Sequence, residues 1–346
     1  MRTMADGKWI HGLTPTTPLA EAARRVLTAR LEVIAKALPL AAQWPDEDVE
    51  HIHQLRVATR RTAEALQIFD SCLPKKLRKR TRKAVKRIRR AAGDARDWDV
   101  FQIALADWAQ KRSPEEQPGL DFLRGYAFQR RQRSQGTVAV LSGQIPDAAK
   151  VAQRVRKPRR KGTPKELVDL AMPWLTDAVG ELNEELRSAG NDMEHLHRLR
   201  ILGKRLRYAM EVFADCFPST FRLEWYPAVE EMQEILGHIN DCNVALQRLV
   251  ELRDQLHEVR PGDWPRLRLG IERWMQSQRR RVPQLRQKFV QWCDHWHTKS
   301  VPLAESLLQT RLSPVHHSPS ENSCPPESPK LPALSNGSAE PTATSG

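Results

Sequence analysis

The sequence lacks any run of about 18 uncharged apolar residues, so it predicts no membrane-spanning helix. It also lacks an apolar stretch behind its first charged residues, which argues against a secretory signal and favours a cytoplasmic location. Its five cysteines are an odd number without Cys-x-x-Cys spacing, so we expect reduced thiols. Segments in which apolar and polar residues alternate are missing as well, which excludes a fold rich in β-strands.

Helix-forming sequence fills most of the chain. Segments rich in Ala, Leu, Arg and Glu place apolar residues with a 3.6-residue period, and short breaks at Pro and Gly separate them. The predicted fold class is all-α, in two helical-bundle repeats. Helices are expected over residues 18–37, 48–70, 76–92, 97–109, 119–135, 138–151, 165–186, 192–214, 221–239, 241–258, 265–281 and 284–297. Expected N-caps are Asp48, Asp97, Asp192 and Asp241, and expected helix ends are Gly93 and Gly237.

Composition divides the chain into a helical domain, residues 18–298, and two flanking segments. The expected parts are an N-terminal extension (1–17), a first repeat (18–151), a basic linker (152–164), a second repeat (165–298) and a mostly disordered tail rich in Ser and Pro (299–346). The formal net charge of +14 favours a polyanionic partner: nucleic acid, an anionic membrane surface or a phosphate polymer.

Two stretches repeat one pattern of histidine and arginine. The first is His51-Ile-His-Gln-Leu-Arg, and His195-Leu-His-Arg-Leu-Arg follows 144 residues later. The matching register continues without gaps as far as Val100 and its counterpart Val244. Such persistence predicts a duplicated helical unit with a duplicated cationic site. His51 and His195 fall in the first helical turn, where a structural role is expected.

Helical geometry places the cations of each copy in one row. At about 100° per residue, Arg56 and Arg60 lie within about 60° of His53, and the apolar residues lie on the opposite side. The second copy's row is His197, Arg200, Lys204, Arg207 and Tyr208. A basic face is ordinarily just solvated, but histidine at the same phase in both copies favours a binding site. If the two helices face each other, their rows converge on a shared groove or pore.

A second basic element follows in the first copy alone. Residues 75–96 include twelve Lys or Arg residues and one acid, whereas the aligned residues 219–240 contain a single cation, Arg222. Like charges at this spacing destabilise a helix by roughly a few tenths of a kcal/mol each, so a bound polyanion would relieve the repulsion. The candidate contacts outside the packing face are Arg78, Arg82, Lys83, Lys86, Arg89 and Arg90.

The paired helices resemble the CHAD domain, the conserved-histidine α-helical domain. The resemblance lies in the two His-x-x-Arg-x-x-x-(Arg/Lys)-Arg helices, each followed by a helix containing Gly93-Asp-Ala-Arg-Asp or Gly237-His-Ile-Asn-Asp, and it spans about residues 18–298. It implies two halves related by a pseudo-twofold axis around a basic cavity that binds inorganic polyphosphate without chemistry. The positions that match the family's motif are His53, Arg56, Arg60, Arg61, His197, Arg200, Lys204, Arg205 and Arg207.

Polyphosphate also suits the residues on physical grounds. It has dense charge and no bases, so a binder needs guanidinium and ammonium donors but no stacking platforms. A function in polymer storage, granule association or regulation is expected, with no cofactor. A protein that binds the backbone of nucleic acid remains an alternative, although residues 75–96 contain no aromatic residue for base stacking.

A phosphohydrolase or a histidine metal site is a second alternative. Residues at i and i+2 point about 200° apart on a helix, so His51 and His53 are poorly placed to share a metal. No carboxylate is identified on the stripes of His53 and His197. We therefore expect a binding protein without catalytic residues or metal ligands.

Overall fold

The described part of the chain consists of helices and turns without β-strands, which confirms the all-α class. The computed structural model describes residues 8–44, 49–158, 162, 164–188 and 192–309 of 346. All described elements belong to one unit, Met1–Leu312, whereas a second unit, Ser313–Gly346, falls outside the described residues. The predictions for Asp48, Cys324 and the tail beyond residue 309 also fall outside them.

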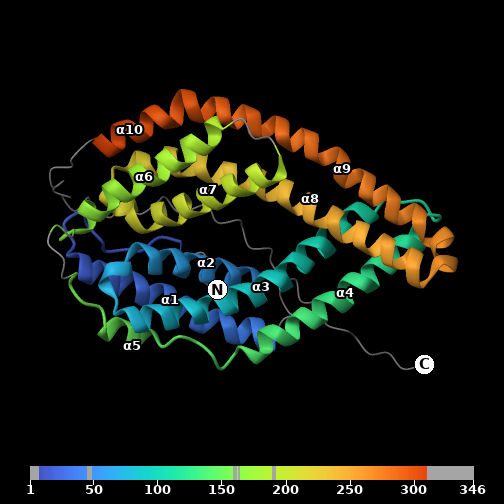
Figure 1. Ribbon diagram of the computed structural model, residues 1–346, viewed down its shortest axis with the longest axis horizontal. Helices are drawn as coiled ribbons and strands as arrows, with labels where there is room; N and C mark the ends of the chain where they lie inside the picture. Colours follow the sequence, from blue (N-terminus) through green and yellow to red (C-terminus); the bar gives the residue numbers. More distant parts are fainter. Residues whose placement is uncertain (1–7, 45–48, 159–161, 163, 189–191, 310–346) are drawn as a thin grey trace, which may run out of the picture. The chain divides into compact units, whose positions relative to one another are not determined.

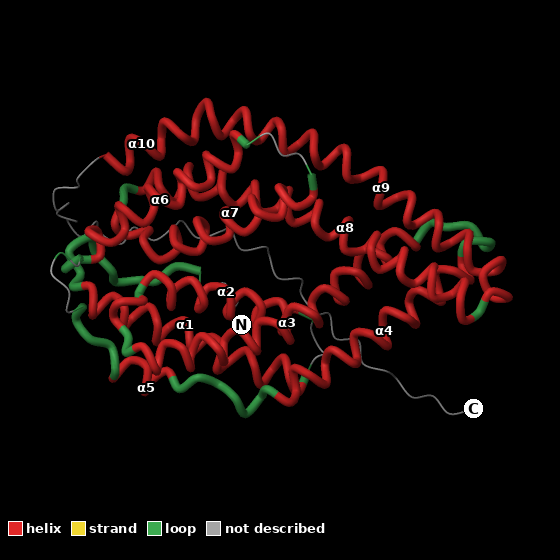
Figure 2. The backbone as a smooth tube through the Cα atoms, in the orientation of Figure 1, coloured by secondary structure: helices red, strands yellow, loops and turns green. Residues whose placement is uncertain are grey.

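Ten α-helices account for most of this unit (Figures 1 and 2). They are α1 (Leu19–Gln43), α2 (Glu50–Ile68), α3 (Lys75–Ala109), α4 (Gln117–Val140), α5 (Ala148–Gln153), α6 (Leu167–Arg187), α7 (Met193–Phe213), α8 (Tyr226–Val259), α9 (Trp264–His295) and α10 (Val301–Gln309). Short 3₁₀ turns follow α2, α7 and α8, and π-helical turns precede α8 and α10. None of these described helices is long and apolar enough to cross a lipid bilayer.

Several helices are longer than the sequence predicted. Helix α3 runs through Gly93 and Asp97, and α8 runs through Gly237 and Asp241, so the predicted ends and N-caps at these residues are wrong. Helix α1 continues past Pro39, and α9 joins two helices predicted separately. An internal glycine costs a helix only about 1 kcal/mol relative to alanine, and the burial of the apolar stripes on both sides of it outweighs that cost.

Two apolar cores hold the helices together. The larger core joins α1, α2 and the first half of α3 to α6, α7 and the first half of α8. The smaller core lies where the second halves of α3 and α8 meet α4 and α9, and it encloses Trp274. Helices α4 and α9 cross so closely that a Cβ atom on Gly119 or Gly270 would lie within 2.3 Å of the other helix's backbone.

Buried apolar residues continue beyond both predicted boundaries of the helical domain, residues 18 and 298. In the N-terminal extension, Ile10 and Leu13 are buried, and the carbonyl of Thr17 accepts a hydrogen bond from the backbone N–H of Leu167 at 2.9 Å. At the other end, Ala304 and Leu307 of α10 belong to the larger core. These apolar residues pack because the bundle offers them a partner surface, which the local composition does not reveal.

Candidate anion-binding site

The two repeated cationic rows lie on helices α2 and α7, which contact each other. On both helices the apolar side predicted from the sequence is buried, with Leu55 and Ala65 on α2 and Leu199 and Leu206 on α7 fully enclosed. Their burial fixes how each helix is rotated about its axis, and with it the direction in which the cations point.

Charges on each row lower the pKa of a group on the other row, so the two rows lie close together. Burial, together with Arg60 and Arg200, lowers the pKa of Lys204 to about 5. Burial also lowers the pKa of Arg60 to about 10, with contributions from Arg56 on its own helix and Arg200 on α7. We name the half-buried side chains that meet here the cationic cluster: His53, Arg56, Arg60, Arg200, Lys204 and Arg207.

Arg56 is held in place by helix α3. Its Nη1 lies 3.3 Å from the Asp97 carboxylate and 3.0 Å from where a Cβ atom on Gly93 would be. Gly93 therefore leaves room for the guanidinium instead of ending the helix. On α7, burial lowers the pKa of Arg200, and Asp241, the counterpart of Asp97, partly offsets this effect. The two aspartates that the sequence suggested as N-caps thus act on equivalent arginines of the cluster.

Helix α3 adds further cations to the same place. Arg89 acts on the pKa of Arg60, and Arg96 acts on that of His53. Arg89 and Arg96 are spaced seven residues apart and so share one face of a continuous helix. Arg82, seven residues before Arg89, is exposed and pairs with Asp70 at 3.8 Å. Arg96 was missed from the sequence because the helix was predicted to end before it.

The other candidate cations of α3 lie elsewhere. Arg78 pairs with Asp70 at 2.5 Å, and Lys83 lines a separate cavity of about 520 Å³ beside α5. Lys86 and Arg90 are exposed. These four were predicted to contact the ligand, and the structure does not bring them into the cationic cluster.

Arg61 and Arg205 are engaged by carboxylates of the protein. Arg61 makes two bonds to Glu211 of α7, with Nε–Oε2 at 2.6 Å and Nη2–Oε1 at 3.0 Å. Glu211 is buried and also accepts a hydrogen bond from the Tyr226 hydroxyl at 3.0 Å. Arg205 pairs with Glu181 at 2.6 Å and stacks on Trp174. Both arginines therefore tie helices together, and their contact with an anion stays a prediction.

The remaining residues predicted on the α7 row differ in accessibility. Arg207 lies 3.4 Å from Glu230 and donates to the Tyr208 hydroxyl at 3.3 Å. Tyr208 is buried, whereas His197 is exposed. Burial lowers the pKa of His197, and Arg200 and Lys204 lower it further. Protein groups thus engage Arg207, whereas the side chain of His197 is accessible to solvent.

Glu64 is a carboxylate on the α2 row that sequence reasoning missed. It follows His53 by eleven residues, which is a rotation of only about 20°, so its helical phase would have revealed it. Its Oε1 is buried without a hydrogen-bond partner. Burial raises the pKa of Glu64 to about 7, against the opposite effect of Arg205 and Arg82. This carboxyl group, on the same helix as Arg56 and Arg60, therefore titrates near neutral pH.

His195 has the structural role that the sequence predicted. Its backbone N–H donates to the N-cap Asp192 Oδ1 at 2.7 Å, and its ring Nδ1 lies 2.9 Å from Glu185. His51 likewise falls in the first turn of α2. Among the described residues, no group of three His, Cys, Asp or Glu side chains is placed to hold a metal ion.

Comparisons with known proteins identify a family and a fold. A family model described as the CHAD domain matches residues 25–250. The crystal structure of the CHAD domain from the plant Ricinus communis has a TM-score of 0.56 and 22% identity over 77% of this chain and 95% of that chain. PptA from Streptomyces chartreusis has a TM-score of 0.57 and 17% identity over 80% of this chain and 100% of that chain. No curated protein matches the sequence.

Proposed function

Because the chain belongs to the CHAD domain family, which is linked to polyphosphate binding in general, we propose that it binds inorganic polyphosphate between α2 and α7 without chemical turnover. The convergence of the two cationic rows is the observation that carries this proposal. The cluster gathers six cationic or titratable side chains from two helices, and α3 adds Arg89 and Arg96.

The cluster is electrostatically unfavourable as it stands. Among the described residues, Arg56 forms an ion pair with one carboxylate, that of Asp97. Arg60 and Lys204 form no ion pair with any described residue. Burying several like charges together is costly unless anions neutralise them. A polyphosphate chain would supply one negative charge per phosphate unit, and arginine forks can bridge its neighbouring oxygens.

The duplication supports a symmetric path for the polymer. Arg56 and Arg200 are equivalent, as are the aspartates Asp97 and Asp241 that act on them. In our proposal a pseudo-twofold axis relates the two halves, and the polymer passes through a basic groove at that axis. Arg82, Arg89 and Arg96 make the first half more cationic, so the chain leaves the groove along α3. The cellular setting that fits this activity is cytoplasmic polymer storage, granule association or regulation.

The test compares two variants in each of which four basic side chains are changed to glutamine. The first changes Arg56, Arg60, Arg200 and Lys204 to glutamine. The control changes four exposed cations of α9 to glutamine: Arg266, Arg268, Arg279 and Arg280. Binding of end-labelled polyphosphate is measured by fluorescence anisotropy at several salt concentrations, and circular dichroism checks the helical content of both variants.

We expect the cluster variant to bind at least about a hundredfold more weakly, since two lost charge-assisted hydrogen bonds alone account for about 3 kcal/mol. The α9 variant should change affinity by less than about fivefold. Equal weakening in both variants would show that only net charge matters. Tighter retention of RNA than of polyphosphate at matched charge, or release of phosphate from the polymer with added Mg²⁺, would contradict non-catalytic polyphosphate binding.

A further inference from the structure

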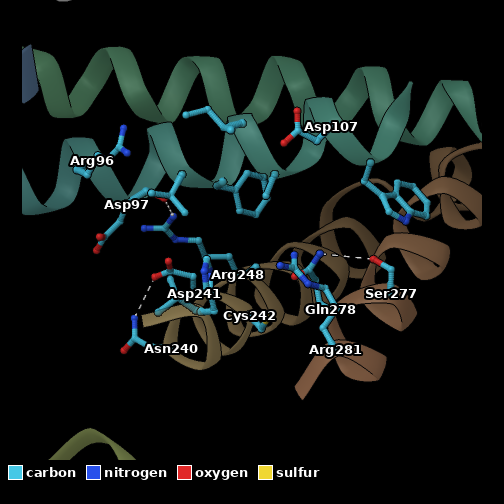
Figure 3. A pocket seen from close by; sticks show the side chains of 18 residues that line it. Arg96, Asp97, Asp107, Asn240, Asp241, Cys242, Arg248, Ser277, Gln278 and Arg281 are labelled. Atoms are coloured by element: carbon cyan, nitrogen blue, oxygen red, sulfur yellow. Dashed lines mark hydrogen bonds between the residues drawn. The ribbon is translucent and has the colours of Figure 1, made fainter. Parts of the chain in front are cut away.

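A cavity of about 750 Å³ lies beside the cationic cluster, between α3, α8 and α9 (Figure 3). Asp97 lines the cavity and also pairs with Arg56, so the two places share a residue. None of the six side chains of the cationic cluster lines the cavity, although Arg96 of α3 does. The cavity is therefore distinct from the cluster, and polyphosphate binding does not account for the residues that line it.

One wall of this cavity is apolar and partly aromatic. Phe101 and Trp108 of α3 line it together with small residues such as Ala104 and Ala245. The Phe101 ring packs edge-on against the buried Trp274, with ring centroids 4.6 Å apart, which fixes its orientation. Phe101 itself is only 3% exposed, so the half-buried Trp108 offers the accessible aromatic surface for a flat ring of a ligand.

Polar groups face the same space from α9 and α3. Gln278 is only 4% exposed, and the one hydrogen bond recorded for its side chain runs from Nε2 to Ser277 Oγ at 3.4 Å. Its carbonyl oxygen thus has no donor among the described residues. Figure 3 shows Gln278 and Ser277 on the opposite side of the cavity from Asp107. A buried amide without partners for its oxygen is suited to reading the edge of a base.

Three arginines border the cavity. The Arg248 guanidinium stacks on Trp98 at 3.8 Å and donates to the Asp97 carbonyl at 2.9 Å, so its position is fixed. Neither Arg96 nor Arg281 forms an ion pair within the part of the chain that the structure describes. Free guanidinium groups at the rim are available for phosphate oxygens.

The geometry points to a binding site for a nucleoside phosphate. The base lies against Trp108, where Gln278 hydrogen-bonds to its edge, and the phosphates face Arg281 and Arg96. Twelve residues of α3 separate Arg96 from Trp108, about 18 Å along the helix axis, which accommodates a base, a ribose and two or three phosphates. This site shares Arg96 with the proposed polyphosphate site and is otherwise additional to it, and it distinguishes its ligand by the base instead of by charge alone.

Isothermal titration calorimetry tests the site with ADP and GDP as ligands. Inorganic pyrophosphate is the matched control because it carries the phosphates without the nucleoside. We expect at least one of the two nucleotides to bind tenfold or more tightly than pyrophosphate. Equal affinity for all three, or no binding of either nucleotide, would overturn the proposal.

Variants then locate the binding. Gln278→Leu should abolish the preference for nucleotide over pyrophosphate. Arg281→Gln should weaken nucleotide binding several-fold. Arg280→Gln, which changes the exposed neighbouring residue, should bind nucleotide normally. Ala104→Leu fills the cavity from a second helix and guards against a folding defect at Gln278. The glutamine variant of the cationic cluster should lose polyphosphate binding but keep nucleotide binding. Loss of nucleotide binding in that variant, with Gln278→Leu unaffected, would place the nucleotide on the cluster and refute the separate site.

Discussion

Binding of polyphosphate should add a proton to Lys204. Burial and the surrounding arginines lower the pKa of this lysine to about 5 in the free protein. At pH 7.5 only about 0.3% of Lys204 is then protonated. The negative charges of a phosphate chain placed among Arg60, Arg200 and Lys204 offset the effect of the arginines on the lysine. They therefore raise the pKa of Lys204 towards its ordinary value of about 10.4.

The sign of the pH dependence follows from this change. The bound state has the higher pKa and so holds more protons, which means that affinity is greatest at low pH and falls as the pH rises. If the bound pKa exceeds about 9, uptake approaches one proton per site at pH 7.5, and affinity falls about tenfold per pH unit between pH 7 and 8.5. Burial lowers the pKa of His53 and of His197 from 6.5, so the histidines add their own uptake only at lower pH.

Calorimetry in two buffers with different ionisation enthalpies measures the proton uptake directly. A long polymer is used because its internal phosphates do not titrate in this range. Lys204→Met is the control, since it retains the length of the side chain without a titrating group; it should remove the uptake above pH 7.5 and bind with little pH dependence there. Binding by the wild type without proton uptake, or uptake that persists in Lys204→Met, would refute the placement of this lysine at the polymer.

Two further predictions concern the framework of the site. Gly93→Ala should displace the Arg56 guanidinium and weaken polyphosphate binding several-fold. Gly237→Ala is the control, because its added Cβ would meet nothing within 4 Å, and it should leave binding unchanged. Both variants should keep or slightly raise the melting temperature, because alanine favours a helix by up to about 1 kcal/mol over glycine. Arg61→Met should lower the free energy of unfolding in urea by about 3 kcal/mol, since it leaves Glu211 buried with a weaker set of partners. Arg30 also pairs with Glu211, with its Nη2 3.5 Å from Oε2. A loss below about 1 kcal/mol would show that Arg30 and Tyr226 suffice to hold that carboxylate.

The helical class and the repeated site were readable from the sequence because both depend on periodicity. The 3.6-residue spacing of apolar residues determines which side of α2 is buried, and it also places Arg56 and Arg60 on the other side. The N-cap at Asp192 was readable because a cap is a local contact, here with a residue three positions on. Matching phases in the two copies then indicated that the rows act together.

Helix ends and the roles of individual cations depended on distant residues. Gly93 looks like a helix terminator in isolation, yet in the fold it makes room for Arg56 from another helix. Arg61 and Arg60 are adjacent cations in the sequence, but Glu211 from α7 engages the first and leaves the second in the cationic cluster. The sequence around Arg61 does not indicate that its partner is a carboxylate 150 residues away.

The sequence by itself determined an all-helical chain, its duplication and the two cationic rows, because these follow from the spacing of residues along one helix. The tertiary structure alone decided that the rows meet, which arginines pair with acids, and that the pKa of Lys204 is lowered. Those outcomes depend on burial and on charges brought together from separate helices, and both exist only once the helices have packed.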